Sequence, residues 1–149
     1  MIGSAHSDSF VLIDTGVMSR LLLGKPQVVK AYDELVEKAV PVISASVYIE
    51  LMRWLIGIRG RATDPISKRE FDAIRKLLDQ YAQLNHGDCI DLAVEACRLF
   101  PDTGLGDCFT IGVGLFFDIP IFTLNHKHFT RIPSVRLYQP DNYALLETQ

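Results

Sequence analysis

Three carboxylates in apolar surroundings are the residues of this chain best suited to do chemistry. Asp14 ends the apolar run 10–13, and Glu50 and Asp107 follow at long intervals in similarly apolar stretches. A charged group at the end of a buried strand is tolerated only where it meets water, a partner or an ion. Any one of these acids is explained as well by an ordinary role at a helix start, but the trio is not.

The trio predicts a divalent-metal site. If the strands beside these acids are parallel neighbours, Asp14, Glu50 and Asp107 fall at one edge of a sheet, where ligands bind and where like charges need a cation. Mg²⁺ and Mn²⁺ fit best, because such hard ions prefer oxygen ligands beside substrate phosphates.

Strand and helix patterns alternate along the chain, which favours an α/β fold with a parallel sheet. Ser44 or Ser46 is expected to cap the helix that carries Glu50, and Ser67 with Glu70 predicts a capping box. Strands are expected over 11–13, 40–43, 119–124 and, at an edge, 135–138. Helices are expected over 17–23, 26–36, 47–58, 67–81, from Asp88 as a cap to about 100, and from about 107 to 117.

Length and composition set the domain organisation. With 149 residues and 48% hydrophobic content, the chain predicts a single domain, 1–149, in which 1–8 form a short disordered lead-in. The apolar segments are shorter than the roughly 20 residues of a membrane span, and no signal-peptide pattern is present, so a cytoplasmic protein is expected. Three cysteines without CxxC spacing predict free, buried thiols. A net charge of −3 argues against general attraction to nucleic acid, although a local basic patch can coexist with it.

Four sequence blocks surround the acids: VLIDTGVMSRLL at 11–22, ISASVYIEL at 43–51, GDCFTIGV at 106–113 and IFTLNHKHF at 121–129. Their order and spacing resemble the motif blocks of PIN domains, most closely those of the toxin ribonucleases of VapBC toxin–antitoxin operons. The resemblance covers 11 to about 140. It implies a three-layer α/β/α sandwich with a central parallel sheet, and metal-dependent endonucleolytic cleavage of RNA.

The same resemblance implies the roles of individual residues. Asp14, Glu50 and Asp107 correspond to the family's catalytic, metal-binding acids. Asn125 stands at a fourth metal-ligand position, where many members have Asp. A neutral amide keeps an oxygen ligand but lowers the charge of the site, so one ion is expected to bind well and a second only weakly. Supporting hydrogen bonds are expected from Thr15 and Thr123.

Basic residues near the acids are candidate contacts for RNA phosphates, although a solvated surface position is the more common role for each of them. They are Arg53, Arg59, Arg61 and Lys127, with His126 and His128 beside Asn125. The resemblance also implies a small antitoxin as partner. A homodimer is expected as well, because the helix over 47–58 carries more apolar residues than one face can bury.

Two other functions fit parts of the sequence. Asp14-Thr15-Gly16 also resembles the active-site triplet of retroviral-type aspartic proteases, in which two such Asp residues from a dimer share a proton. That fold is nearly all-β, and it leaves Glu50 and Asp107 unexplained. A PIN-like interaction module without activity is the third alternative, against which the retention of all three acids argues.

Overall fold

A parallel sheet of four strands forms the centre of the fold in the computed structural model, which describes residues 9–146. The strands are β1 (Phe10–Ile13), β2 (Val40–Ser44), β3 (Gln83–Leu84) and β4 (Ile121–Phe122), in the order β3-β2-β1-β4. β1 is central, and its Leu12 lies opposite Val42 of β2 and Ile121 of β4. The carboxyl ends of β1, β2 and β4 therefore meet at one edge, as the sequence predicted.

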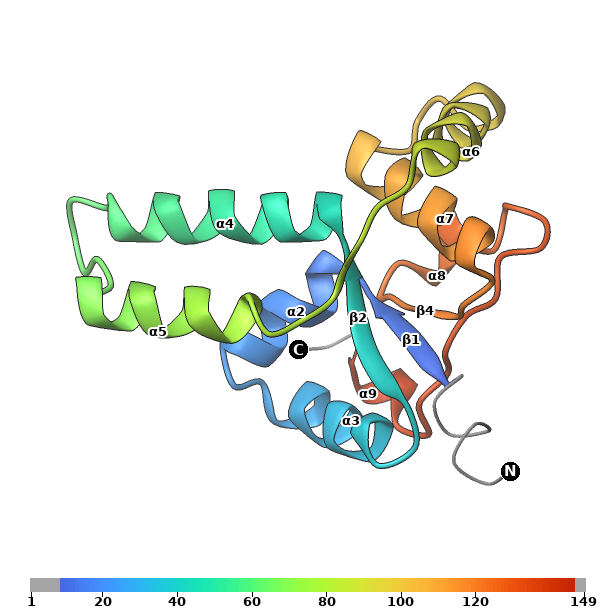
Figure 1. The fold of residues 1–149 in the computed structure, drawn as a ribbon. Coiled ribbons are helices and arrows are strands. Elements are labelled where there is room, and N and C mark those ends of the chain that lie inside the picture. Colours follow the sequence, from blue (N-terminus) through green and yellow to red (C-terminus); the bar gives the residue numbers. More distant parts are fainter. Residues whose placement is uncertain (1–8, 147–149) are drawn as a thin grey trace.

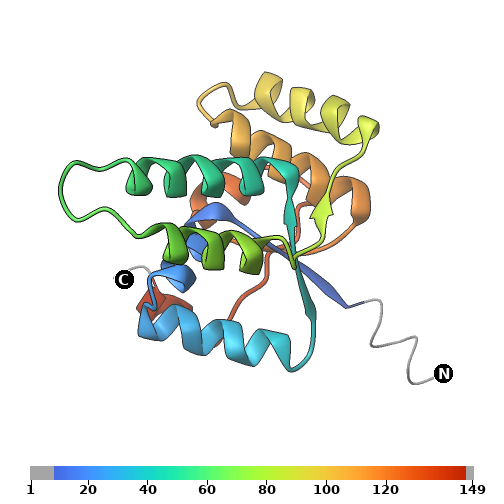
Figure 2. The ribbon, with the colours of Figure 1, turned by 60° about the vertical axis from the view of Figure 1, so that its left-hand side comes forward.

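Helices cover both faces of this sheet (Figure 1). In chain order they are α2 (Thr15–Leu22), α3 (Pro26–Val36), α4 (Ala45–Arg59), α5 (Lys68–Leu78), α6 (Gly87–Leu99), α7 (Leu105–Phe117), α8 (His126–Phe129) and α9 (Tyr143–Leu146). α4 and α5 lie side by side and extend beyond the sheet as a helical hairpin (Figures 1 and 2). Along residues 9–146, no helix combines the length and the apolar character that crossing a membrane requires.

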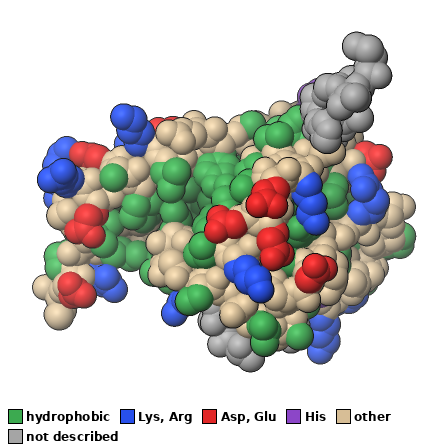
Figure 3. Space-filling view, turned by 90° about the horizontal axis from the view of Figure 1, so that it is seen from below, with side chains coloured by type: hydrophobic (Ala, Val, Ile, Leu, Met, Phe, Trp, Pro, Cys, Tyr) green, Lys and Arg blue, Asp and Glu red, His purple; other side chains and the backbone are tan. Residues whose placement is uncertain are grey.

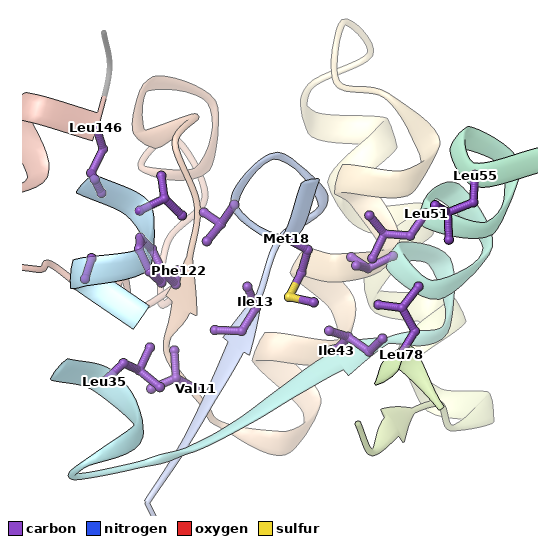
Figure 4. Packing of buried hydrophobic residues seen from close by; sticks show 14 residues of the cluster. Val11, Ile13, Met18, Leu35, Ile43, Leu51, Leu55, Leu78, Phe122 and Leu146 are labelled. Atoms are coloured by element: carbon purple, nitrogen blue, oxygen red, sulfur yellow. The ribbon is translucent and has the colours of Figure 1, made fainter. Parts of the chain in front are cut away.

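Alternating residues of β1 build two separate hydrophobic cores. Val11 and Ile13 pack with one cluster, formed with α2, α3, α4 and α5, whereas Leu12 packs with the other, formed with α6 and α7. Figure 4 shows the first cluster, in which Ile13 and Ile43 of the sheet lie close to Met18 of α2. Successive side chains of a strand point to opposite faces, so a strand that is apolar throughout must be covered on both sides. The predicted three-layer α/β/α architecture is confirmed.

Local helix signals were also confirmed at two positions. Ser44 caps α4 by accepting a hydrogen bond from the Val47 N–H, and Ser67 forms the predicted capping box with Glu70 at the start of α5. The cap of α6 was predicted wrongly. His86, rather than Asp88, precedes the helix, and its ring nitrogen accepts the Asp88 N–H.

Other predicted boundaries were wrong where pairing depends on the tertiary structure. The strand expected over 119–124 pairs only at Ile121 and Phe122, because the Ile119 N–H bonds back to the end of α7 and Thr123 turns toward Asp14. The edge strand expected over 135–138 is a single bridge between Leu137 and Ile121. Strand β3 and helices α8 and α9 were not predicted. The lead-in expected over 1–8 lies outside the described residues, and the cysteine prediction holds except that Cys97 is only partly buried.

Close packing of α7 on α6 depends on Gly112. A Cβ at this position would lie 2.5 Å from the Cys89 carbonyl oxygen and 3.0 Å from the Ala93 nitrogen, both backbone atoms of α6. We expect Gly112→Ala to destabilise the protein by about 1–3 kcal/mol, because the two helices must separate. The sign is informative, since Gly→Ala within an unconstrained helix is normally stabilising.

Urea unfolding measures this effect, and Gly87→Ala is the matched control, because nothing lies within 4 Å of a Cβ at the start of α6. A Gly112→Ala variant as stable as the control would contradict the packing argument.

Candidate active site

Asp14 is delivered to the carboxyl edge of the sheet by the central strand. Its N–H donates to the Phe122 carbonyl of β4 (2.9 Å), and its own carbonyl accepts from Met18 N–H as α2 begins (3.0 Å). Both sides of the residue are thus fixed by secondary structure. The side chain is nevertheless buried, with 7% of its surface exposed.

Hydrogen bonds from the segment after β4 hold the Asp14 carboxylate. The Thr123 hydroxyl donates to Asp14 Oδ2 (2.8 Å), and the same hydroxyl accepts from the backbone N–H of Asn125 (3.0 Å). Thr123 is fully buried. Asp14 and Asn125 are therefore linked through one threonine, although they are far apart in the sequence.

Asp107 lies in the first turn of α7 and faces the same region. The Asn125 side-chain amide donates to Asp107 Oδ2 at 3.5 Å, a long contact. The pKa of Asp14 is raised to about 6, mainly by burial and next by the neighbouring Asp107 charge, while the Thr123 hydrogen bond opposes the rise. Burial also raises the pKa of Asp107, whereas Asn125 and the His128 charge lower it. Each of these two carboxylates is thus disfavoured as an anion.

Glu50 sits on the α4 side of this region. Its Oε1 accepts a hydrogen bond from the Thr15 hydroxyl at 2.9 Å. Its carboxylate also lies against Gly106, where an added Cβ would come within 2.6 Å of Oε1. Glu50 therefore lies between the start of α2 and the start of α7. There it contacts Gly106, the residue directly before Asp107.

The donor set suits a hard divalent cation. Asp14, Glu50 and Asp107 supply carboxylate oxygens, and Asn125 adds an amide beside Asp107. Among residues 9–146, none of the ion pairs with Lys or Arg involves these acids. In the same part of the chain, no three His, Cys, Asp or Glu side chains are close enough to hold a metal ion as they stand. The acids surround one region without forming a closed cluster.

A hollow of about 580 Å³ opens beside Glu50, lined by α2 and α4. Thr15 and Glu50 line it, together with Trp54 and with Arg53 and Arg61, two of the predicted phosphate contacts. Two other candidates are placed differently. Arg59 donates to the Ile66 carbonyl (3.1 Å), outside the lining of the hollow, and Lys127 is exposed on α8.

Sequence reasoning missed two features of this site. The sequence motif over 106–113 predicts no role for Gly106, although the bare backbone there is what admits the Glu50 carboxylate. The sequence predicts only a candidate RNA contact for His128, yet its charge also lowers the pKa of Asp107. For Gly106, the signal available in the sequence was its position directly before Asp107, a candidate metal ligand. His126 instead stacks on Tyr143, with ring centroids 3.9 Å apart.

The raised pKa of Asp14 predicts a pH-dependent cost to stability. The folded protein holds the proton more tightly than the unfolded chain, so this group lowers stability as pH rises from about 4 through about 6. We expect metal-free Asp14→Asn to be more stable than wild type by about 2–3 kcal/mol at pH 7.5, and by less than half of that at pH 4.5.

Urea unfolding in EDTA at both pH values tests this, with Asp91→Asn, an exposed carboxyl on α6, as the control. If Asp14→Asn were more stable than wild type by the same free energy of unfolding at both pH values, the charge of Asp14 would not be the cause of the difference.

Solved structures share the architecture that holds this site. No protein-family model and no curated protein sequence matches the chain. A chain of VapBC2 from Rickettsia felis, bound to a DNA fragment from their promoter, matches with a TM-score of 0.71 and 15% identity, over 89% of this chain and 99% of that chain. VapBC-1 from nontypeable Haemophilus influenzae matches with a TM-score of 0.70 and 19% identity, over 87% and 97%. A toxin-antitoxin complex from Klebsiella pneumoniae matches with 0.67 and 19%, over 84% and 94%. The chain therefore has the PIN-like fold of these toxin–antitoxin structures.

Proposed function

We propose that this chain is a metal-dependent endoribonuclease and the toxin of a type II toxin–antitoxin pair. The observation that carries the proposal is the Asp14 carboxylate, buried at the end of the central strand beside Asp107 and without a cationic partner among the described residues. A fold that keeps such a charge needs a ligand to compensate it. The likeness to toxin–antitoxin structures supports the biological role.

The chain's residues divide the chemistry among them. Asp14, Glu50, Asp107 and the Asn125 amide would hold Mg²⁺ or Mn²⁺, which when bound acidifies a water molecule and neutralises charge on the phosphodiester. Thr123 and Thr15 orient the Asp14 and Glu50 carboxylates through their hydroxyls. The fold supplies positioning, because both hydroxyls come from segments that directly follow β1 and β4.

The hollow beside Glu50 gives a path for the substrate. Arg53 and Arg61 lie along it and would contact RNA phosphates leading to the acids. Lys127, which is exposed on α8, would contact the RNA on the side of the site where Asn125 lies. Arg59 has the weakest case of the predicted contacts, because its guanidinium is bound to the Ile66 carbonyl.

The exposed apolar surface supports the proposed partners. Ile49 and Ile56 of α4 are 65% and 60% exposed, seven residues apart on one side of the helix. On the face seen from below in Figure 3, hydrophobic side chains also run as a band toward a group of Asp and Glu side chains. A homodimer through the exposed side of α4 and a small antitoxin in the hollow near Glu50, with a basic side chain among the acids, fit these surfaces.

The aspartic-protease alternative loses its structural basis. Thr15 and Gly16 lie inside α2 instead of an extended loop, and the sheet is parallel with helices on both faces. The remaining alternative, an inactive PIN-like module, predicts that no divalent cation will support RNA cleavage.

Cleavage of a generic RNA tests the nuclease directly. We expect cleavage to need Mg²⁺ or Mn²⁺, to stop in EDTA and to return when Mn²⁺ is restored. Asp14→Asn, Glu50→Gln and Asp107→Asn should each lower the cleavage rate by about 100-fold or more, because each removes charge from the metal site. Asp91→Asn, outside the site, should cleave like wild type. Cleavage that persists in EDTA, or acid variants that cleave normally in saturating Mn²⁺, would refute the assignment.

Light scattering tests the dimer. At micromolar concentration the wild type should scatter as a dimer, and Ile56→Glu should scatter as a monomer, because a charge at a buried apolar contact opposes association. Val94→Glu is the matched control, since Val94 is a similarly exposed residue (61%) on α6. A monomeric wild type would contradict the homodimer, and a dimeric Ile56→Glu would exclude this side of α4 from the interface.

A further inference from the structure

Three hydroxyl groups join the start of α4 to the first turns of α7. Ser44 Oγ, which caps α4, lies 3.0 Å from Thr110 Oγ1 and 2.9 Å from Ser46 Oγ. Ser44 and Thr110 are fully buried. Inside a protein such a connected polar group is rigid, because breaking one contact leaves a buried hydroxyl without a partner.

Ser46 extends this contact to the backbone that precedes Asp107. Its hydroxyl donates to the Gly106 carbonyl at 3.2 Å and lies 3.4 Å from Thr110 Oγ1. Gly106 in turn lies against the Glu50 carboxylate, at a distance that leaves no room for a side chain. One residue of α7 thus contacts both Ser46 and Glu50.

The helix spacing places the Ser46 hydroxyl one turn from Glu50 and the Thr110 hydroxyl one turn from Asp107. Ser46 and Glu50 are four residues apart on α4, and Asp107 and Thr110 are three apart on α7, so each pair shares one helix face. The two faces meet with hydroxyls opposite hydroxyls. Movement of one helix along the other would therefore change the separation of Glu50 and Asp107.

We propose that Ser44, Ser46, Gly106 and Thr110 are positioning residues that set where Glu50 lies relative to Asp107, and so set the metal affinity of the site. This inference rests on the proposed function, in which both acids are metal ligands. In this proposal none of the four residues is itself a metal ligand. The three hydroxyl residues act through the helices that carry Glu50 and Asp107, and Gly106 acts by leaving room for the Glu50 carboxylate.

Calorimetric titration of the RNA-free protein with Mn²⁺ tests the proposal. Thr110→Val keeps the shape of the side chain but removes the hydroxyl, and it should weaken Mn²⁺ binding by about 10-fold or more, as loss of partners that orient metal ligands does elsewhere. Thr110→Ser keeps the hydroxyl and should bind Mn²⁺ to within about twofold of wild type, a difference of about 0.4 kcal/mol. A purely structural role would change the urea midpoint but leave the affinity of the folded protein unchanged.

Gly106→Ala separates positioning from folding more sharply. The three atoms nearest to the added methyl all belong to the flexible end of Glu50, so we expect the carboxylate to be pushed away while the helices stay in place. We expect a near-wild-type urea midpoint together with the same loss of Mn²⁺ affinity. Gly87→Ala, in open space on α6, is the control and should bind like wild type.

The outcomes distinguish this inference from the nuclease assignment. Wild-type affinity for Mn²⁺ in both Thr110→Val and Gly106→Ala overturns the positioning role, even if RNA is cleaved. Wild-type protein that binds Mn²⁺ but cleaves no RNA overturns the proposed function and leaves the positioning result to be judged by binding alone. Wild-type protein that binds no Mn²⁺ overturns both.

Discussion

The buried carboxylate at the end of the central strand is the constraint around which this structure is arranged. β1 lies between β2 and β4, so its carboxyl end opens between the starts of α2, α4 and α7. Asp14 occupies that point, and burial and the charge of Asp107 both oppose its ionisation. A chain of hydrogen bonds starts at this carboxylate. The Thr123 hydroxyl donates to Asp14 and accepts from the Asn125 N–H, and the Asn125 side chain donates to Asp107.

The two hydrophobic cores make this unfavourable placement tolerable. β1 contributes Val11 and Ile13 to one core and Leu12 to the other, so the strand is held from both faces. Its end cannot move toward water without disturbing both layers of helices. The free energy gained by packing in the two cores therefore offsets the unfavourable free energy of the ionised Asp14 carboxylate. Such compensation is usual where function requires an unfavourable local state.

How far the sequence predicts this molecule depends on the range of the interactions involved. β1, the Ser44 cap and the Ser67–Glu70 capping box depend on neighbours in the chain, and all were predicted. β3 was not predicted, and β4 was predicted too long. Each pairs through two residues, and such short strands exist only because the sheet is already present. At the site, apolar context identified the acids, but the approach of Glu50 to Gly106 joins segments over fifty residues apart and has no local signal beyond the glycine. Arg59 shows the same limit, because its partner is a loop carbonyl.

The electrostatics of the acids also connect the two parts of the proposed function, which are metal-dependent cleavage of RNA and inhibition by an antitoxin. Repulsion between Asp14 and Asp107 disfavours the state in which both are ionised, so a cation placed between them would relieve this repulsion. Under the proposed function, Mg²⁺ or Mn²⁺ and a basic antitoxin side chain would gain from the same repulsion and would exclude one another. Since Glu50 lines the hollow, an antitoxin segment lying in it would block both the proposed path of RNA and access to the cation site at Glu50. Catalysis and inhibition would then both depend on the carboxylate that the central strand holds out of water.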